Sequence, residues 1–102
     1  MDALGRMMVT TDGFRAMAGI LQALADEACD GRLVALQEGG YNPEYVPYCT
    51  LAAVEGVMGR RSAIPDPYEG EPELARARVE HRPHQSAAIA EVVAVQRTWW
   101  RI

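Results

Sequence analysis

The stretch LVALQEGGYNP, residues 33–43, decides which fold class the sequence predicts. Its four consecutive apolar residues, 33–36, are typical of a short strand that is covered on both faces, as in parallel sheets. Gly39 and Gly40 follow, and glycines allow backbone conformations that other residues resist. Functional groups in open α/β sheets gather at the carboxyl ends of strands, so Tyr41 is a candidate functional residue. The alternative interpretation is a strand, a turn and an ordinary surface tyrosine.

Three segments around this stretch have the patterns of helices. A threonine pair suited to N-capping opens residues 10–31, where an apolar stripe recurs every three or four positions before an Asp-Gly terminator. Pro47 is tolerated only in a first helical turn, so a second helix should begin near Val46 and end at 59–61. A last helix is predicted over 83–100, with at least one of its two final tryptophans packed on the domain. The stripe of the first helix consists of Phe14, Met17, Ala18, Leu21, Leu24, Ala25 and Ala28.

Residues 62–82 form the least regular part of the sequence. Three prolines and three glutamates lie in residues 65–73, which indicates an irregular surface segment. A helical turn over residues 73–79 is the one regular element expected there. The chain of 102 residues is long enough for one domain at most.

Composition and charge exclude several classes of protein. The net charge of −4 argues against a nucleic-acid partner, which would need a basic patch. No apolar run is long enough to span a bilayer, and the N-terminus lacks the form of a signal peptide, so we expect a cytoplasmic protein with no membrane partner. The spacing of Cys29 and Cys49 matches no zinc or redox motif, and both are expected to be buried thiols.

A single predicted strand poses a physical difficulty. Its N–H and C=O groups would lack partners on both edges, whereas sheets that stand alone usually need three or more strands. The sequence therefore predicts an α/β fold of which this chain holds only one part. The alternative is a helical mini-domain in which residues 33–36 cross the core, but the short run and the Gly39-Gly40 pair argue against it.

Three motifs occur in the order found in a known family. They are DALGRM at 2–7, TTDGF at 10–14 and EGGYN at 38–42, and the tail from His84 to Trp100 is also similar. Together they resemble the C-terminal third of the histone deacetylase superfamily, with the closest likeness to bacterial class II members such as acetylpolyamine amidohydrolase and acetoin-utilisation relatives. The resemblance covers nearly the whole chain.

The resemblance implies a fold, a cofactor and site residues. The fold would be the C-terminal part of an arginase/deacetylase-type domain with a parallel sheet, in which a zinc ion activates water at the strand ends. Asp2 corresponds to the second zinc-ligating aspartate, and Tyr41 to the tyrosine that donates a hydrogen bond to the oxyanion. Gly39 and Gly40 correspond to the glycines that leave room for the acyl tunnel of the substrate. Ala3 replaces the proline that usually follows the ligand aspartate.

Other parts of the family's catalytic site have no counterpart here. The paired histidines and the Asp-x-His zinc ligands of the family lie upstream of these motifs, and His81 and His84 match neither. As a metal pair of their own, His81 and His84 would lack a third ligand. A catalytic zinc site needs about three protein ligands. We therefore expect residues 1–102 to be a partial deacetylase domain that is inactive and binds no zinc alone.

The sequence leaves the partner and the substrate open. Self-association, or the missing N-terminal part of the domain, would cover the unpaired edges of the strand. A non-catalytic interaction module is the alternative function. Acetyl-lysine, acetylpolyamine and other acyl amides all remain candidate substrates.

Overall fold

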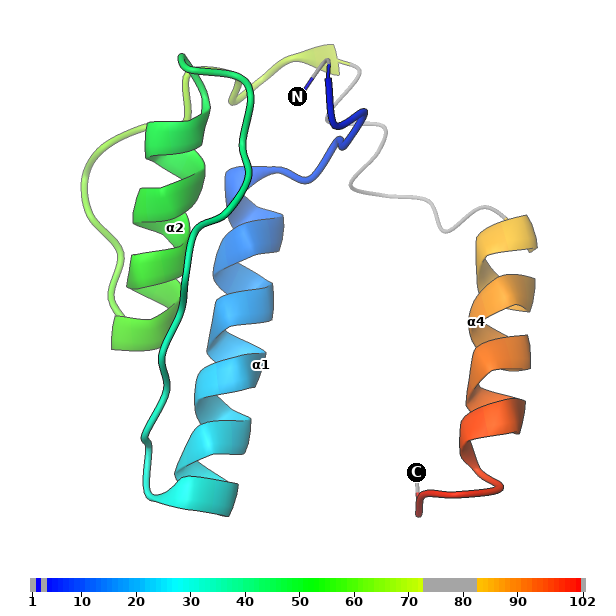
Figure 1. The fold of residues 1–102 in the computed structure, drawn as a ribbon. Coiled ribbons are helices and arrows are strands. Elements are labelled where there is room, and N and C mark those ends of the chain that lie inside the picture. The colour runs from blue at the N-terminus through cyan, green and yellow to red at the C-terminus, as the bar shows by residue number, and fades with distance from the viewer. Residues whose placement is uncertain (1, 3, 73–82, 102) are drawn as a thin grey trace. The chain divides into compact units, whose positions relative to one another are not determined.

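The computed structural model describes residues 2, 4–72 and 83–101. These residues contain three helices, α1 (Thr11–Cys29), α2 (Val46–Met58) and α4 (Pro83–Gln96) (Figure 1). The chain divides into two compact units, Met1–Glu69 with α1 and α2, and Gly70–Ile102 with α4. The bounds of α1 and α2 and the start of α4 agree with those expected from the sequence to within two residues.

Local signals explain where α1 begins and ends. The hydroxyl of Thr10 accepts a hydrogen bond from the backbone N–H of Gly13 at 3.2 Å, which satisfies one of the free donors of the first turn. Asp30 has left-handed backbone angles and ends the helix, and the N–H groups of Asp30 and Gly31 both return to the carbonyl of Ala25. The predicted cap and terminator are confirmed.

The boundaries of α2 also have local causes. Pro47 lies in its first turn, where a missing N–H costs no helical hydrogen bond. Gly59 follows the last turn with a φ of 61°, a conformation that favours glycine. Asn42 prepares the start of the helix, because its side-chain oxygen accepts from the N–H groups of Glu44 at 3.0 Å and Tyr45 at 3.1 Å.

Small residues allow α1 and α2 to pack closely. The two helices lie side by side and run in the same direction, because the chain returns along them between Asp30 and Tyr45 (Figure 1). Ala18 of α1 and Ala52 of α2 are buried. A Cβ at Gly56 would clash with the carbonyl oxygen of Arg15 and would lie 2.8 Å from the Cβ of Ala18. The helix pair therefore depends on a glycine at the crossing.

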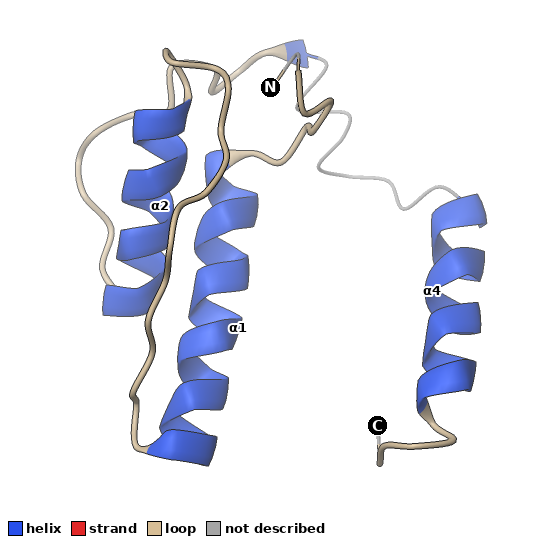
Figure 2. Ribbon diagram, in the orientation of Figure 1, coloured by secondary structure: helices blue, strands red, loops and turns tan. Residues whose placement is uncertain are grey.

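The predicted α/β fold is wrong for the structure described. Helices and loops make up its ribbon (Figure 2), and the one β-contact among the described residues is an isolated antiparallel bridge between Asp2 and Met7. The predicted strand at 33–37 has no regular secondary structure, and Val34 and Leu36 are 84% and 81% exposed. A strand requires a neighbour for its backbone hydrogen bonds, and the described residues place none beside 33–37.

The apolar run has a different role in this structure. The 19 residues of α1 measure about 28 Å at a rise of about 1.5 Å per residue. About nine extended residues, at roughly 3.3 Å each, span that distance. Residues 33–41 thus form the extended middle part of the connection between Cys29, the end of α1, and Val46, the start of α2.

The apolar stripe predicted for α1 divides into two groups. Ala18 and Ala25 are buried, together with Thr11. Met17, Leu21 and Leu24 are instead exposed. Ala18, whose Cβ faces Gly56 of α2, is one of the small residues, and its size permits the close approach of the two backbones.

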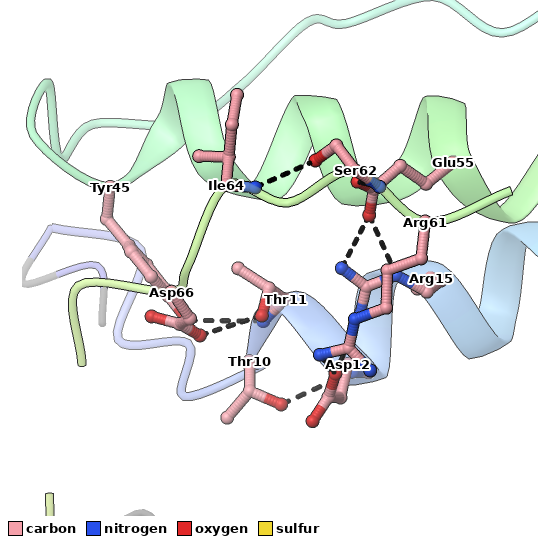
Figure 3. Close-up of polar contacts among 11 residues, drawn as sticks. Thr10, Thr11, Asp12, Arg15, Tyr45, Glu55, Arg61, Ser62, Ile64 and Asp66 are labelled. Carbon is pink, nitrogen blue, oxygen red and sulfur yellow. Dashed lines mark hydrogen bonds and ion pairs between the residues drawn. The ribbon is translucent and has the colours of Figure 1, made fainter. Parts of the chain in front are cut away.

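The segment after α2 is tied back to both helices. The carboxylate of Asp66 accepts hydrogen bonds from the hydroxyls of Thr11 at 2.7 Å and Tyr45 at 2.9 Å (Figure 3). The ring of Tyr68 meets that of Tyr45 edge-on, with centroids 4.9 Å apart. We call residues 59–69 the strap. Of the segment predicted to be irregular, residues 62–71 contain bends and turns, and the turn expected at 73–79 lies outside the described residues.

The second unit contains α4. This helix begins at Pro83 as predicted and ends at Gln96, four residues before the predicted limit. Trp99 and Trp100, which follow the helix, are both exposed, and packing of one of them on the domain stays a prediction. None of the helices described is both long and apolar enough to cross a membrane.

Candidate functional site

Asp2 organises a tight loop at the start of the chain. Its backbone N–H donates to the carbonyl of Met7 at 3.0 Å. Its Oδ1 accepts from the N–H groups of Leu4 at 3.0 Å and Gly5 at 2.7 Å, as in the turns that aspartate commonly forms. A Cβ at Gly5 would lie 3.3 Å from the Cγ of Asp2, so a small residue suits that position. We call residues 2–7 the Asp2 loop.

The other carboxylate oxygen of Asp2 reaches a distant segment. The backbone N–H of Tyr41 donates to Oδ2 at 2.8 Å, across 39 residues of sequence. The hydrogen bonds from the N–H groups of Gly5 and then Tyr41 lower the pKa of Asp2, because they stabilise its charged form. The structure thus brings two of the predicted site residues together and keeps one of them as a carboxylate.

The two glycines before Tyr41 differ in what the structure requires of them. Gly40 has a φ of 114°, and a Cβ there would lie 2.7 Å from Cγ2 of Val46. A Cβ at Gly39 would meet no atom within 4 Å. Gly40 is therefore needed for the turn into α2, whereas Gly39 leaves open space beside the backbone. The side-chain amide of Gln37 also contacts this turn, because its Nε2 donates a hydrogen bond to the carbonyl of Gly39 at 3.2 Å.

The side chain of Tyr41 is the most accessible functional group of this site. It is 61% exposed. Within the described residues, its hydroxyl has no hydrogen-bond partner, so it can donate to a ligand. A tyrosine hydroxyl held beside an open backbone position can bind a carbonyl or an oxyanion.

The residues present fit one ligand position of a zinc site. A carboxylate has about four lone-pair positions, and the N–H groups of Leu4, Gly5 and Tyr41 occupy three on Asp2. One position on Oδ2 is left for a cation. The described residues contain no group of three or more His, Cys, Asp and Glu side chains that could hold a metal. His84 lies on α4 in the second unit, and His81 lies outside the described residues.

The sequence analysis missed a polar cluster at the starts of α1 and α2. Figure 3 shows Thr11 and Tyr45 meeting at the starts of α1 and α2, with Asp66 of the strap beside them. The N–H of Thr11 donates to the hydroxyl of Tyr45 at 3.1 Å, and Tyr45 is only 2% exposed. Burial, above all, raises the pKa of Tyr45 to about 12. This cluster fixes Tyr45, the residue that precedes α2 and lies four residues after Tyr41.

A second group of charges joins α1, α2 and the strap, and within it Glu55 is buried whereas Arg15 and Asp12 are partly exposed. Nη2 of Arg15 lies 2.6 Å from Oε2 of Glu55, and Nη1 lies 2.6 Å from Oδ1 of Asp12 (Figure 3). The backbone N–H of Ser62 donates to the other oxygen of Glu55 at 2.7 Å. The hydrogen bonds from the side chain and backbone of Ser62, followed by that from Arg15, lower the pKa of Glu55 to about 2. No spacing in the sequence indicates this group, because its members come from three separate segments.

Comparison with known proteins identifies the family. The family described as "Histone deacetylase domain" matches residues 1–57. The chain is 40% identical over 93 residues to the histone deacetylase-like amidohydrolase of Pseudomonas aeruginosa, which covers 91% of the chain and 24% of that relative. It is 34% identical over 96 residues to Histone deacetylase 8 of Arabidopsis thaliana, which covers 93% of the chain and 23% of the plant protein.

These matches confirm the resemblance found in the sequence. The chain spans about a quarter of the length of the curated relatives it matches. The matched region contains both the Asp2 loop and the Gly39-Gly40-Tyr41 turn. The chain therefore belongs to the histone deacetylase family.

Proposed function

We propose that this chain supplies Tyr41 and Asp2 to the active site of a zinc-dependent deacetylase that hydrolyses acetyl-lysine or acetylpolyamine-type amides. The observation that carries the proposal is the 2.8 Å hydrogen bond from the N–H of Tyr41 to Oδ2 of Asp2. This bond joins the backbone of Tyr41, whose hydroxyl is the proposed oxyanion donor, to the proposed metal ligand. Membership of the family supports the reaction class.

Each residue has a defined task in this proposal. The hydroxyl of Tyr41 donates a hydrogen bond to the oxyanion that forms when water attacks the amide carbonyl. Such a donor contributes about 3 kcal/mol in comparable sites. Asp2 remains deprotonated and offers its free lone pair to the metal. Zinc, when bound, acidifies water and polarises the carbonyl. Gly39 and Gly40 keep the backbone clear for the acyl group.

The same proposal holds that residues 1–102 are inactive alone. Catalytic zinc sites use about three protein ligands, and Asp2 is the one ligand proposed here. The remaining ligands and the proton-transferring bases then come from the part of the domain that precedes these motifs in the family. A cytoplasmic location belongs to this proposal.

A chimera provides the test. This chain would replace the matching segment of the Pseudomonas aeruginosa relative, and zinc content and hydrolysis of an acetyl-lysine substrate would be measured. We expect the chimera to hold zinc and to be active. Tyr41→Phe should lower kcat about 100-fold with zinc retained, because only the oxyanion donor is lost. Asp2→Ala should lower zinc content.

The controls separate the roles. Tyr48→Phe removes a tyrosine hydroxyl from the first turn of α2 and should leave kcat unchanged. Equal activity of the Tyr41→Phe chimera and its parent would contradict the role of Tyr41. Deacetylation by the purified 102-residue chain would contradict the claim that it is inactive alone.

A specific observation favours a second candidate, a non-catalytic interaction module. Met17, Ile20, Leu21 and Leu24 of α1 and Val34 and Leu36 of the following segment are all large, apolar and exposed. Surfaces of this kind are commonly covered by a partner. Self-association, or docking of the rest of the domain, would remove this apolar area from water.

A further inference from the structure

We infer that the Asp2 carboxylate is a positioning residue for Tyr41 and holds the Gly39-Gly40-Tyr41 turn in place without any metal. The importance of that turn for catalysis rests on the proposed function. The positioning itself concerns only residues of this chain. Asp2 would then have two separable tasks, one toward a metal and one toward the backbone of the oxyanion donor.

The two oxygens of Asp2 divide their hydrogen bonds between two segments. Oδ1 accepts from Leu4 and Gly5 and so fixes the carboxylate within its own loop. Oδ2 accepts from the N–H of Tyr41 at 2.8 Å. The carboxylate is therefore immobilised from one side and presents its other oxygen to the distant turn. Hydrogen bonds to an ionised acceptor are stronger than those between neutral groups.

The residues on either side of Tyr41 show why this bond matters. Gly40 has a φ of 114°, a conformation that fits only a glycine well. Asn42 caps the turn into α2 through its side-chain oxygen. These features fix the turn relative to α2. The hydrogen bond to Asp2 fixes the turn relative to the Asp2 loop. Tyr41 is therefore held both by the start of α2 and by the Asp2 loop.

Asparagine at position 2 distinguishes the two oxygens. In Asp2→Asn the amide oxygen can still accept from Leu4 and Gly5, but the NH₂ group cannot accept from the N–H of Tyr41. Amide hydrogen exchange and ¹⁵N–¹H NMR spectra would be recorded on the 102-residue chain with EDTA present. We expect the Tyr41 amide to exchange roughly three- to tenfold faster in the variant and its resonance to shift.

Two references keep the measurement specific. Glu38→Gln removes an exposed carboxylate three residues before Tyr41 and should leave the exchange of its amide unchanged. The amide of Ala18, buried in α1, reports on the fold of the unit. The inference fails if the Tyr41 amide exchanges equally in Asp2→Asn and the parent chain, if Glu38→Gln has the same effect, or if Ala18 accelerates as much as Tyr41.

This outcome is independent of the proposed function. Because the samples contain no metal, the exchange of the Tyr41 amide reports on positioning alone. An inactive chimera together with a Tyr41 amide that responds to Asp2→Asn would reject the proposed function and keep the inference. An active chimera together with a Tyr41 amide that exchanges equally in Asp2→Asn and the parent chain would reject the inference and keep the proposed function.

Discussion

Gly56 shows how one residue sets the distance between two helices. A Cβ at this position would clash with the carbonyl of Arg15 and approach the Cβ of Ala18 to 2.8 Å. We expect Gly56→Ala to lower the free energy of unfolding by about 1–3 kcal/mol, as overpacking does in other cores. Alanine favours a helix over glycine by about 1 kcal/mol, so the steric effect should exceed this gain. Urea denaturation followed by far-UV circular dichroism would measure the change.

Gly39→Ala is the matched control for that substitution. A Cβ at Gly39 would meet no atom within 4 Å, so the free energy of unfolding should stay within about 0.5 kcal/mol of the parent value. A Gly56→Ala chain as stable as the Gly39→Ala chain would show that α1 and α2 do not pack as closely as described.

The carboxylate of Glu55 makes stability depend on pH. Hydrogen bonds from Ser62 and Arg15 lower its pKa from the ordinary 4.5 to about 2. A lowered pKa in the folded state stabilises the fold above pH 4.5, and this contribution is lost as the pH falls from 4.5 through 2. We therefore expect the urea midpoint to decrease over that interval. Asp2, whose pKa is also lowered, acts in the same direction.

Glu55→Gln tests the assignment. It should lower the urea midpoint at pH 7, because Arg15 loses its ionised partner, and it should flatten the decrease between pH 4.5 and 2. Glu27→Gln, an exposed change on α1, should leave the profile as in the parent. An equally steep profile in the Glu55→Gln chain would assign the pH dependence to other carboxylates.

At the scale of elements, one carboxylate ties the strap to the starts of both helices. Asp66 accepts hydrogen bonds from the hydroxyls of Thr11 and Tyr45. Asp66→Ala would leave these two groups without this acceptor in a part-buried site, and we expect a loss of about 1–3 kcal/mol in the free energy of unfolding. Hydrogen exchange should also accelerate within the strap. Glu44→Ala, an exposed carboxylate before α2, should change neither quantity. Unchanged exchange in the Asp66→Ala strap would contradict this arrangement.

The elements differ in how far the sequence predicts them. The limits of α1 and α2 are set by Thr10, Pro47 and Gly59. Each of these residues acts on its own helix end, so the limits can be predicted from the neighbouring sequence alone. A strand is set by its neighbours across a ladder. The strand predicted from the apolar run 33–36 is therefore wrong for this structure, because the described residues give the run no partner.

At the scale of the whole molecule, the candidate site combines two kinds of information. Asp2 is a candidate only through the resemblance to a family. For Tyr41, the place after an apolar run suits a functional residue and an ordinary surface tyrosine alike, and the resemblance distinguishes the two. The hydrogen bond between them joins positions 39 residues apart and could not be predicted from spacing. The cluster of Thr11, Tyr45 and Asp66 likewise depends on how three segments meet.

The apolar surface of the first unit has a consequence for the state of the chain in solution. Ile20 and Leu24 lie one helical turn apart on α1 and are 69% and 58% exposed. Burying such side chains contributes about 25 cal/mol per Å² of apolar area. We therefore expect the 102-residue chain to associate with itself, with a sedimentation coefficient that increases with concentration.

Substitution on this surface should separate association from folding. The double change Ile20→Gln and Leu24→Gln removes apolar area that is already exposed, so the free energy of unfolding should change by less than about 1 kcal/mol. Sedimentation velocity should then show a single species at every concentration. Glu27→Gln, on the same helix, should associate like the parent chain. A parent chain that sediments as a monomer throughout would exclude self-association, and an active chimera would then favour the rest of the domain as the cover for this surface.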